Sequence, residues 1–485
     1  MTTISALPFD PLIVDIADYV MDFQIQSDHA FEMSRWVLLD SMACAFEALE
    51  DPACLHLLGA YEGQPNLPLG ARVPGTAYQL DPVNAAFNTG CLVRWTDFSD
   101  TWVAAQTTHP SDDVGAILAV CDYRSRILVS RGEAPLSMRV VLAAMIKAHE
   151  IQGVLGMGQS LNPYGIDHTF LVKIACAAVC TELLGGTREQ VLAATSLAFF
   201  DAPLCVHRFG SNTGPRKGWA AAEAASHAVS LAFKAIKGEP GYPQVLSHPQ
   251  WGFCHTRLKD QSFRLGGCLG SLVMENVLFK LLGPVVIHAQ SAIECALALS
   301  GSVKDQINNV ERIEIYTHHR TLETIDKSGP LRNPADRDHC LQYAMAVTLL
   351  NGALKASDYR DEAALDPRID QLRHVMVVKE DPNYTQRYLD PALRANSNGM
   401  EIFYKNGHRS GRIEFENPVG HPSRRDEAKP ILVDKLSQRL KQRYTTAKQK
   451  KILKLGLDHQ QFMLTPVPHW MNLLATRKPI FKAGA

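Results

Sequence analysis

Hydrophobic residues recur at helical spacing along most of the first 280 residues. Ile13, Ile16, Val20 and Phe23 lie three or four positions apart, as residues on one face of an α-helix do. Ser27 precedes the next periodic run and is a residue type that caps helix N-termini. The chain therefore begins with two predicted helices.

Capping signals and alanine-rich runs continue this pattern. Asp81 followed by Pro82 is typical of an N-cap and the first helical position, so a helix is predicted from residue 83 to about residue 94. Three later runs, at residues 140–149, 170–184 and 219–236, are rich in Ala and Leu. We expect these runs to form helices that are buried on most of their surface, in an alanine-rich core.

The pattern changes after about residue 282. Residues 310–318 alternate apolar and charged side chains after one irregular step, which predicts a half-buried strand. Residues 400–404 and 412–415 flank an Asn-Gly pair that suits a type I′ turn, which predicts a hairpin. Helical periodicity returns at residues 339–350 and 431–457.

These elements predict a mainly α protein with two domains. Residues 1–275 and 421–485 form a large all-helical domain, and residues 276–420 form a smaller α+β domain inserted before the C-terminal helices. A length of 485 residues agrees with two to four domains, at about 150 residues per domain.

Composition narrows the class of protein. The 49 Lys and Arg nearly cancel the 50 Asp and Glu, which argues against a nucleic-acid-binding or membrane-surface protein. No stretch approaches the roughly eighteen uncharged apolar residues of a membrane span. The first 24 residues contain four Asp and no Lys or Arg, unlike secretory or transit peptides. We therefore expect a cytoplasmic protein whose eleven cysteines are free thiols.

Several motifs are incomplete or absent. Residues 149–153 begin like a zinc-protease helix but lack its second histidine, and no Cys-x-x-Cys pair occurs. The Gly-rich residues 210–218 lack the spacing of a phosphate-binding P-loop. A metal site built from dispersed residues stays open on these grounds.

A dense polar cluster occupies residues 95–102 and 109–113. Its acids and hydroxyls are typical helix caps and turn-formers, and Ser111 or Asp112 could cap a helix that starts at Val114. The alternative is a pocket rim, because two Trp and one His lie among four acids.

Residues 207–218 form a second cluster, in which Gly, Asn and Thr accompany Arg216 and Lys217. This composition suits an anion-binding loop, and the alternative is a solvated basic loop. Lys280, His288 and His168 lie beside apolar runs, where a lone histidine is more often a hydrogen-bonded core residue than a catalyst.

Longer stretches resemble a known family. They are Arg-Val-Pro-Gly-Thr at 72–76, Arg-Trp-Thr-Asp-Phe-Ser-Asp-Thr-Trp at 94–102, His-Pro-Ser-Asp at 109–112, Met-Ile-Lys-Ala-His-Glu-Ile-Gln-Gly at 145–153 and Asn-Pro-Ala-Asp-Arg-Asp-His-Cys at 333–340. In these stretches the chain is similar to the MmgE/PrpD family, and the resemblance covers essentially its whole length. One departure is Gly283 before Pro284, where family members commonly carry an aromatic residue.

The resemblance implies a cofactor-independent lyase that binds no metal and forms a homodimer. The α+β domain would be a lid, with the active site between the two domains. The positions that match the family's catalytic residues are Asp97, Thr101, His109 and His168. Those that match or lie near its substrate-binding positions are Lys280, either Arg216 or Lys217, and His288.

The reaction implied is loss of water from 2-methylcitrate to give a methyl-substituted cis-aconitate, a step in propionate breakdown. The residue types suit this reaction, because cations can bind a tricarboxylate and two histidines can act as base and acid, with Asp97 orienting its partner. Aconitase-type enzymes use an iron–sulfur cluster for a similar dehydration, and the cysteine spacing here offers no obvious ligand set for one. The alternatives are a cis-aconitate decarboxylase and a non-catalytic tricarboxylate-binding protein.

Overall fold

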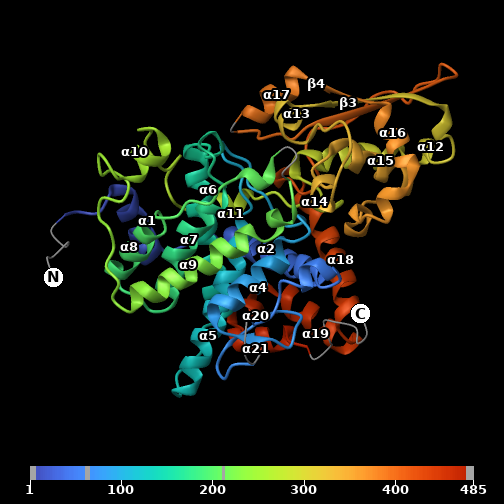
Figure 1. Cartoon of the computed structure of the whole chain (residues 1–485). Helices are drawn as coiled ribbons and strands as arrows, with labels where there is room; N and C mark the ends of the chain where they lie inside the picture. Colours follow the sequence, from blue (N-terminus) through green and yellow to red (C-terminus); the bar gives the residue numbers. More distant parts are fainter. Residues whose placement is uncertain (1–6, 61–65, 210–212, 391, 477–485) are drawn as a thin grey trace.

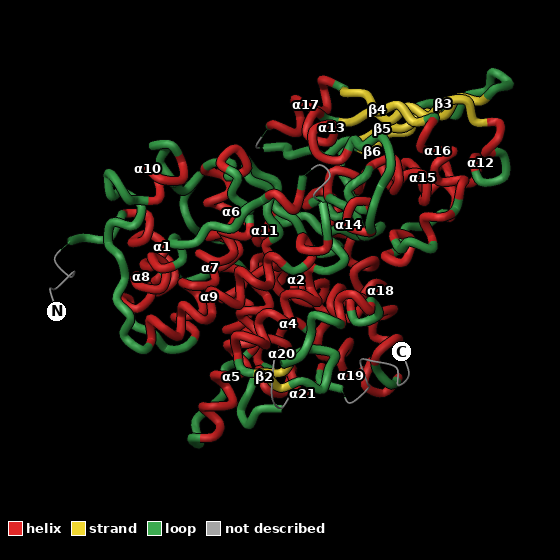
Figure 2. Tube along the Cα trace, viewed as in Figure 1, coloured by secondary structure: helices red, strands yellow, loops and turns green. Residues whose placement is uncertain are grey.

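The computed structural model describes residues 7–60, 66–209, 213–390 and 392–476. It consists of a larger helical part and a smaller lid that projects from it at the top right of the view (Figure 1). We use "helical part" for the described residues up to 281 and from 419, and "lid" for residues 282–418. The predicted mainly α fold class is confirmed, with strands concentrated in the lid (Figure 2).

The helices of the helical part are α1 (Pro11–Asp22), α2 (Asp28–Ala48), α3 (Pro52–Leu55), α4 (Pro82–Arg94), α5 (Val114–Ser130), α6 (Met138–Gly158), α7 (Thr169–Leu183), α8 (Arg188–Leu197), α9 (Ala220–Ile236), α10 (Phe253–Leu258), α11 (Leu272–Asn276), α18 (Arg425–Arg443), α19 (Thr446–Leu457), α20 (His459–Leu464) and α21 (Val467–Leu474). A two-stranded antiparallel ribbon joins β1 (Ala71–Arg72) and β2 (Gln79–Leu80).

The lid contains the helices α12 (Gln290–Val303), α13 (His319–Ile325), α14 (Pro334–Arg337), α15 (Leu341–Asn351), α16 (Pro367–His374) and α17 (Pro382–Leu389), and the strands β3 (Val310–Thr317), β4 (Met376–Glu380), β5 (Asn398–Tyr404) and β6 (Ile413–Phe415). The strands form one sheet in the order β4-β3-β5-β6, in which only the β3–β4 pair is parallel. Helix α12 packs on β5 and β6, and α15 packs on α12.

Two hydrophobic cores separate these parts. The core of the helical part joins residues from 12 to 281 with residues from 419 to 474, so the C-terminal helices complete the first core. The core of the lid contains buried residues between 285 and 404. The domain limits at residues 275/276 and 420/421 stay a prediction.

Local capping signals are confirmed where side chain and backbone are close in sequence. The Ser27 side chain accepts a hydrogen bond from the Ala30 amide, and Asp81 accepts hydrogen bonds from the Val83 and Asn84 amides. The irregular step in the predicted strand is real, because the register of β3 against β5 shifts between Val310 and Arg312. The predicted helix at 431–457 is two helices, α18 and α19.

Two local predictions are wrong. The hairpin exists, but its turn is not type I′, because only Gly407 of the Asn-Gly pair has a positive φ. The Gly407 amide donates to the Tyr404 carbonyl, so the left-handed residue follows the turn, as in a longer hairpin loop with a bulge. Ser111 and Asp112 do not cap α5, since both lie in a 3₁₀ turn, η2 (Pro110–Asp113). Asp113 takes the N-cap position, and its side chain makes no capping hydrogen bond to the helix.

Helix α6 is long and apolar enough to cross a membrane by length and composition, although it contains Lys147 and Glu150 and is therefore not the uncharged stretch that the sequence was expected to lack. Of its most apolar window, 78% is buried inside the protein, and core helices of soluble proteins pass the same test. All eleven cysteines lie among the described residues, and each is free, as expected.

Candidate active site

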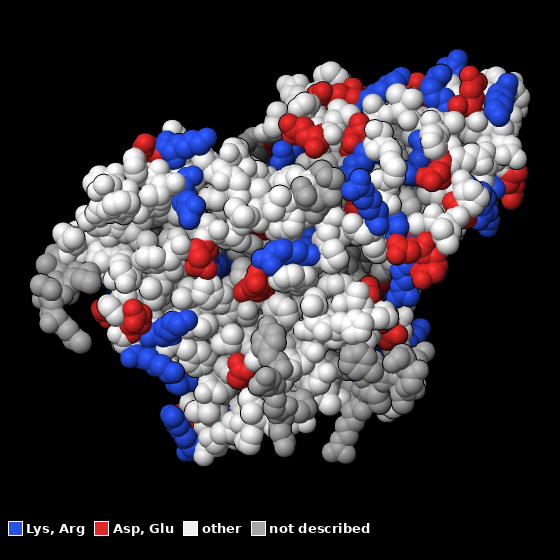
Figure 3. All heavy atoms as spheres, in the orientation of Figure 1, with Lys and Arg blue, Asp and Glu red and all other residues white. Residues whose placement is uncertain are grey.

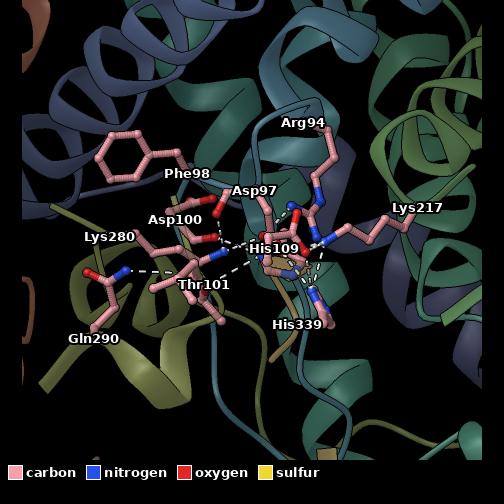
Figure 4. A network of polar contacts seen from close by, with 12 residues as sticks. Arg94, Asp97, Phe98, Asp100, Thr101, His109, Lys217, Lys280, Gln290 and His339 are labelled. Carbon is pink, nitrogen blue, oxygen red and sulfur yellow. Dashed lines mark hydrogen bonds and ion pairs between the residues drawn. The ribbon is translucent and has the colours of Figure 1, made fainter. Parts of the chain in front are cut away.

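Asp97 lies at the centre of a buried network of charged side chains (Figure 4). Its carboxylate accepts hydrogen bonds from Arg94 Nη1 and Lys280 Nζ, each at 2.5 Å, and lies 3.5 Å from Lys217 Nζ. Burial alone would raise the pKa of Asp97, but the three cations outweigh it and hold that pKa well below its ordinary value. The carboxylate is therefore ionised throughout the neutral range.

The backbone of Asp97 is unusual. Helix α4 ends at Arg94, and Asp97 follows with a φ of 49°, a left-handed conformation that few non-glycine residues adopt. Such backbone conformations concentrate at functional sites, where the surrounding contacts must hold them in place. Here those contacts are the ion pairs with Arg94 and Lys280.

Lys280 reaches the network from the segment that joins the two parts of the molecule. The Thr101 and Leu278 backbones exchange two hydrogen bonds of 2.8 Å, which aligns this segment with the loop after Asp97. On the lid side, the Gln290 side-chain amide donates to the Gly283 carbonyl at 2.9 Å. Burial lowers the pKa of the fully buried Lys280, and Asp97 opposes this effect.

Two histidines face each other beside the cations. The rings of His109 and His168 lie 5.5 Å apart, and His109 Nδ1 lies 2.9 Å from the Asp100 carbonyl oxygen and 3.3 Å from Thr101 Oγ1. Burial and the charges of Arg94 and Lys280 hold the pKa of His109 well below its usual value. His109 is therefore a neutral ring at neutral pH.

His168 stands between two carboxylates. Its Nε2 lies 3.7 Å from Asp112 Oδ2, and its Nδ1 lies 3.7 Å from Asp167 Oδ1. Asp112 also faces Arg94, whose Nε is 3.5 Å from Asp112 Oδ1. Asp112 therefore joins the second histidine to the cations around Asp97.

A third buried histidine supports the loop from beneath. His149 of α6 places its Nδ1 2.9 Å from Asp113 and its Nε2 3.6 Å from Asp100. Burial would lower the pKa of His149, but the two carboxylates more than compensate and raise it to about 9. Asp100 Oδ1 also accepts a hydrogen bond from the Ser111 amide at 3.0 Å. The two ends of the loop at residues 100–113 are therefore held together by His149 and by this hydrogen bond.

The lid supplies two further polar groups, Asp338 and His339. Both contact Lys217, which lies in the 3₁₀ turn η6 (Pro215–Gly218) of the helical part: Lys217 donates to Asp338 and lies 2.8 Å from His339 Nδ1. A cleft of about 500 Å³, with Trp95 on the helical side and Tyr359 on the lid side, reaches Lys217 and Asp338. The network thus lies between the two parts of the molecule, next to a solvent-accessible cleft.

The structure brings six of the predicted site residues together. They are Asp97, Thr101, His109, His168, Lys217 and Lys280, and none is more than 8% exposed. Sequence left open whether Arg216 or Lys217 enters the site, and the structure places Lys217 there.

Arg216 and His288 lie outside the network. Arg216 points to the surface, where it pairs with Glu223 and lies 4.4 Å above the Trp219 ring. This placement does not fit the predicted substrate-binding role, because neighbouring residues of the turn face opposite sides. His288 is buried in the lid, 5.2 Å from the His318 ring and 5.7 Å from the Tyr388 ring.

Sequence reasoning assigned no role to several residues that the structure brings to the site. Arg94, Asp338 and His339 lie within the stretches that carried the family resemblance, which is the signal that could have found them. Lys435 of α18 gave no signal, yet its Nζ donates to Asp40 at 2.7 Å, to the Phe98 carbonyl at 2.8 Å and to the Lys280 carbonyl at 3.3 Å.

The surface looks different from this interior. On the face drawn in Figure 3, basic and acidic side chains are interspersed over the lid, and much of the helical part is uncharged.

Among the described residues, no group of three or more His, Cys, Asp or Glu has an arrangement that could hold a metal ion. The charged groups described above are instead paired with one another in the interior.

Comparison with known proteins gives consistent matches. Residues 14–266 match the model of the MmgE/PrpD N-terminal domain, and residues 284–459 match that of the MmgE/PrpD C-terminal domain. The chain is 47% identical over 469 residues to the 2-methylcitrate dehydratase of Salmonella typhimurium, covering 96% of this chain and 97% of that protein. It is 46% identical over 470 residues to the 2-methylcitrate dehydratase of Cupriavidus necator, with the same coverage. It is 43% identical over 469 residues to the mitochondrial 2-methylcitrate dehydratase of Yarrowia lipolytica, covering 96% of this chain and 90% of that protein.

Proposed function

The chain belongs to the MmgE/PrpD family, and on that premise we propose that it is a hydro-lyase that removes water from 2-methylcitrate to give 2-methyl-cis-aconitate. The observation that carries this proposal is the 47% identity, over nearly the full length of both chains, with a bacterial 2-methylcitrate dehydratase. This reaction would place the protein in propionate catabolism.

The charges at the site suit a tricarboxylate. Three buried cations, Arg94, Lys217 and Lys280, share the carboxylate of Asp97. Arg94 and Lys217 also face a second carboxylate each, whereas Lys280 has Asp97 alone among the described residues. Charge-assisted hydrogen bonds from such cations are the strong contacts by which proteins hold carboxylates. A substrate bound here has its carboxylates beside the two histidines.

The chemistry requires a base for the methine proton next to a carboxylate. The neutral ring of His109 suits this role: if its Nδ1–H donates to the Asp100 carbonyl, Nε2 is left as the proton acceptor. Negative charge then develops on the adjacent carboxylate, where the cations stabilise it. The C–O bond of the neighbouring carbon breaks as His168 gives a proton to the hydroxyl, which leaves as water.

Asp97 and Thr101 have supporting roles in this scheme. Asp97 holds Lys280 and Arg94 in fixed positions, so they need not reorganise as charge develops. The Thr101 hydroxyl, 3.3 Å from His109 Nδ1, helps to fix the orientation of that ring. We propose that acid/base side chains carry the reaction without a cofactor. We also propose that the protein is a homodimer, which light scattering on the purified protein would test by measuring its mass.

The test is an assay of the purified chain with three compounds in turn: 2-methylcitrate, citrate and cis-aconitate. Growth of the ultraviolet absorbance of a conjugated tricarboxylate, strongest with 2-methylcitrate, supports the proposal. Release of carbon dioxide from cis-aconitate would replace it with a decarboxylase. Binding of all three without turnover would indicate a tricarboxylate-binding protein.

A further inference from the structure

The lid sends one short segment, residues 333–340, into the charged network of the helical part. This segment is held at several points. The Asn333 side chain donates to the Thr213 carbonyl at 3.0 Å, which joins the segment to the loop before Lys217. Arg337 Nη1 donates to the Tyr359 carbonyl at 2.7 Å within the lid. These contacts fix the two residues that follow, Asp338 and His339.

His339 lies against the centre of the site (Figure 4). Its Nδ1 lies 2.7 Å from Asp338 Oδ1, 2.8 Å from Lys217 Nζ and 3.9 Å from Asp97 Oδ2. All three of these contacts use the same ring nitrogen. The other nitrogen, Nε2, makes no hydrogen bond within the described part of the chain.

The ring is also accessible. The His339 side chain is 18% exposed, whereas those of Lys217 and Lys280 are 4% and 0% exposed. The cleft of about 500 Å³ between the helical part and the lid is lined by Lys217 and Asp338, two of the three residues near His339 Nδ1, and the His339 ring lies directly behind them. A ligand that enters from the cleft to contact Lys217 therefore approaches the ring of His339.

We propose that His339 is a substrate-binding residue that the lid contributes, with its Nε2 donating to a substrate carboxylate that Lys217 also binds. The inference rests on the proposed function for the class of ligand, a tricarboxylate. Lys217 is the positioning residue for the ring, because its ammonium can only donate to Nδ1 and so leaves the ring proton on Nε2. Asp338 in turn accepts a hydrogen bond from Lys217 and holds that ammonium in place. Burial and the charge of Lys217 lower the pKa of His339 in the empty site, and an anionic ligand would oppose that shift.

Two substitutions separate the nitrogens of the ring. In His339→Asn, the side-chain amide reaches the position of Nδ1 but not that of Nε2. In His339→Gln, the amide reaches the position of Nε2 and can still donate to a carboxylate. His319→Gln is the matched control, because His319 is a lid histidine on the surface, 57% exposed.

The measurement is the affinity of each protein for propane-1,2,3-tricarboxylate, an inert tricarboxylate, by calorimetry, together with kcat and KM for 2-methylcitrate. We expect His339→Asn to weaken binding and raise KM by about 10- to 100-fold, the usual effect of one charge-assisted hydrogen bond. We expect His339→Gln to stay within about threefold of the unmodified protein, because its amide replaces Nε2. The control should be unchanged.

Several outcomes would overturn the inference. Unchanged affinity in His339→Asn would mean that the ring only supports Lys217. Loss of kcat at constant KM in both variants would mean that the ring transfers a proton instead of holding the substrate. If the unmodified protein binds and turns over its substrate in these cases, the proposed function stands while this inference fails. If the unmodified protein neither binds the tricarboxylate nor dehydrates 2-methylcitrate, both fail.

Discussion

Replacing Asp97 by Asn tests whether the buried cations depend on one carboxylate. Asn keeps the shape of the side chain and tolerates the left-handed φ of 49°, so the substitution removes charge without new backbone strain. Arg94 would keep Asp112 at 3.5 Å, and Lys217 would keep Asp338. Lys280 has no other carboxylate partner among the described residues, so the variant leaves one buried ammonium unpaired.

The structure sets the size of the effect. Removing one partner of a buried ion pair typically costs about 3–5 kcal/mol of unfolding free energy. The loss has a ceiling, because Lys280 can give up its proton. At about 1.36 kcal/mol per pKa unit, deprotonating a lysine of ordinary pKa near 10.4 at pH 7 costs about 5 kcal/mol. We therefore expect Asp97→Asn to lower stability by about 3–5 kcal/mol at pH 7.

The dependence on pH identifies the cause. A lysine whose pKa is depressed in the folded state destabilises the protein below its unfolded pKa, and the penalty disappears when both states are neutral. The difference between Asp97→Asn and the unmodified protein should therefore shrink as the pH rises from 7 towards 10. The assay is urea unfolding followed by circular dichroism at several pH values.

A surface pair provides the control. Glu223→Gln removes the partner of the exposed Arg216 and should change stability by no more than about 1 kcal/mol. A loss below about 1 kcal/mol in Asp97→Asn, or a loss that does not vary with pH, would refute the account of Asp97 as the counter-ion of Lys280.

Three further predictions concern other parts of the site. Lys217→Met should raise KM for 2-methylcitrate about tenfold or more in steady-state assays, whereas Arg216→Met should leave it nearly unchanged, because only Lys217 points inward. The pKa of His149 is raised to about 9, so the stability that its protonated ring contributes is complete below pH 6.5 and is lost as the pH rises through 9. The free energy of unfolding in urea should therefore fall over this pH range, and His149→Asn should make that fall smaller. Gly420→Ala would place a Cβ 1.9 Å from the Phe279 carbonyl oxygen, so we expect about 1–3 kcal/mol lower stability and a reduced kcat as the neighbouring Lys280 shifts.

Each of these three has a result that contradicts it. Equal KM values for the two methionine variants would mean that the orientation of the turn differs in solution. An unchanged pH slope in His149→Asn would remove that histidine as the titrating group. For Gly420→Ala the control is Gly301→Ala, because Gly301 has open space around it and should tolerate Ala. Equal stability of the two variants would argue against the close contact between residue 420 and the Phe279 carbonyl.

Much of the fold could be predicted because its signals are local. Hydrophobic periodicity and the caps at Ser27 and Asp81 depend on residues within one or two turns of each other. The wrong turn type has the same origin, because an Asn-Gly pair is compatible with more than one hairpin loop and the loop length is set by strand pairing. Asp112 looked like a cap, since the sequence could not show that Arg94 and His168 lie beside it.

The site itself is non-local. Composition marked the two polar clusters that contain Asp97, Thr101, His109 and Lys217, but the roles of all six residues came from the family resemblance. Periodicity cannot tell Arg216 from Lys217, because only the geometry of a short turn sends one outward and the other inward. His339 lies 122 residues from Lys217 in sequence, so their contact depends on how the lid docks. The glycine at 283 also has a tertiary reason, because a Cβ there would lie 2.9 Å from Leu354.

The most direct test of the account is proton NMR of 2-methylcitrate incubated with the purified protein and, in parallel, with His109→Ala. We predict that the unmodified protein removes the methine proton, so the methyl doublet of the substrate gives way to the methyl singlet of 2-methyl-cis-aconitate. The variant should leave the doublet unchanged on the same timescale. A singlet that forms equally fast with His109→Ala, or no singlet with the unmodified protein, would contradict the claim that this buried site dehydrates 2-methylcitrate.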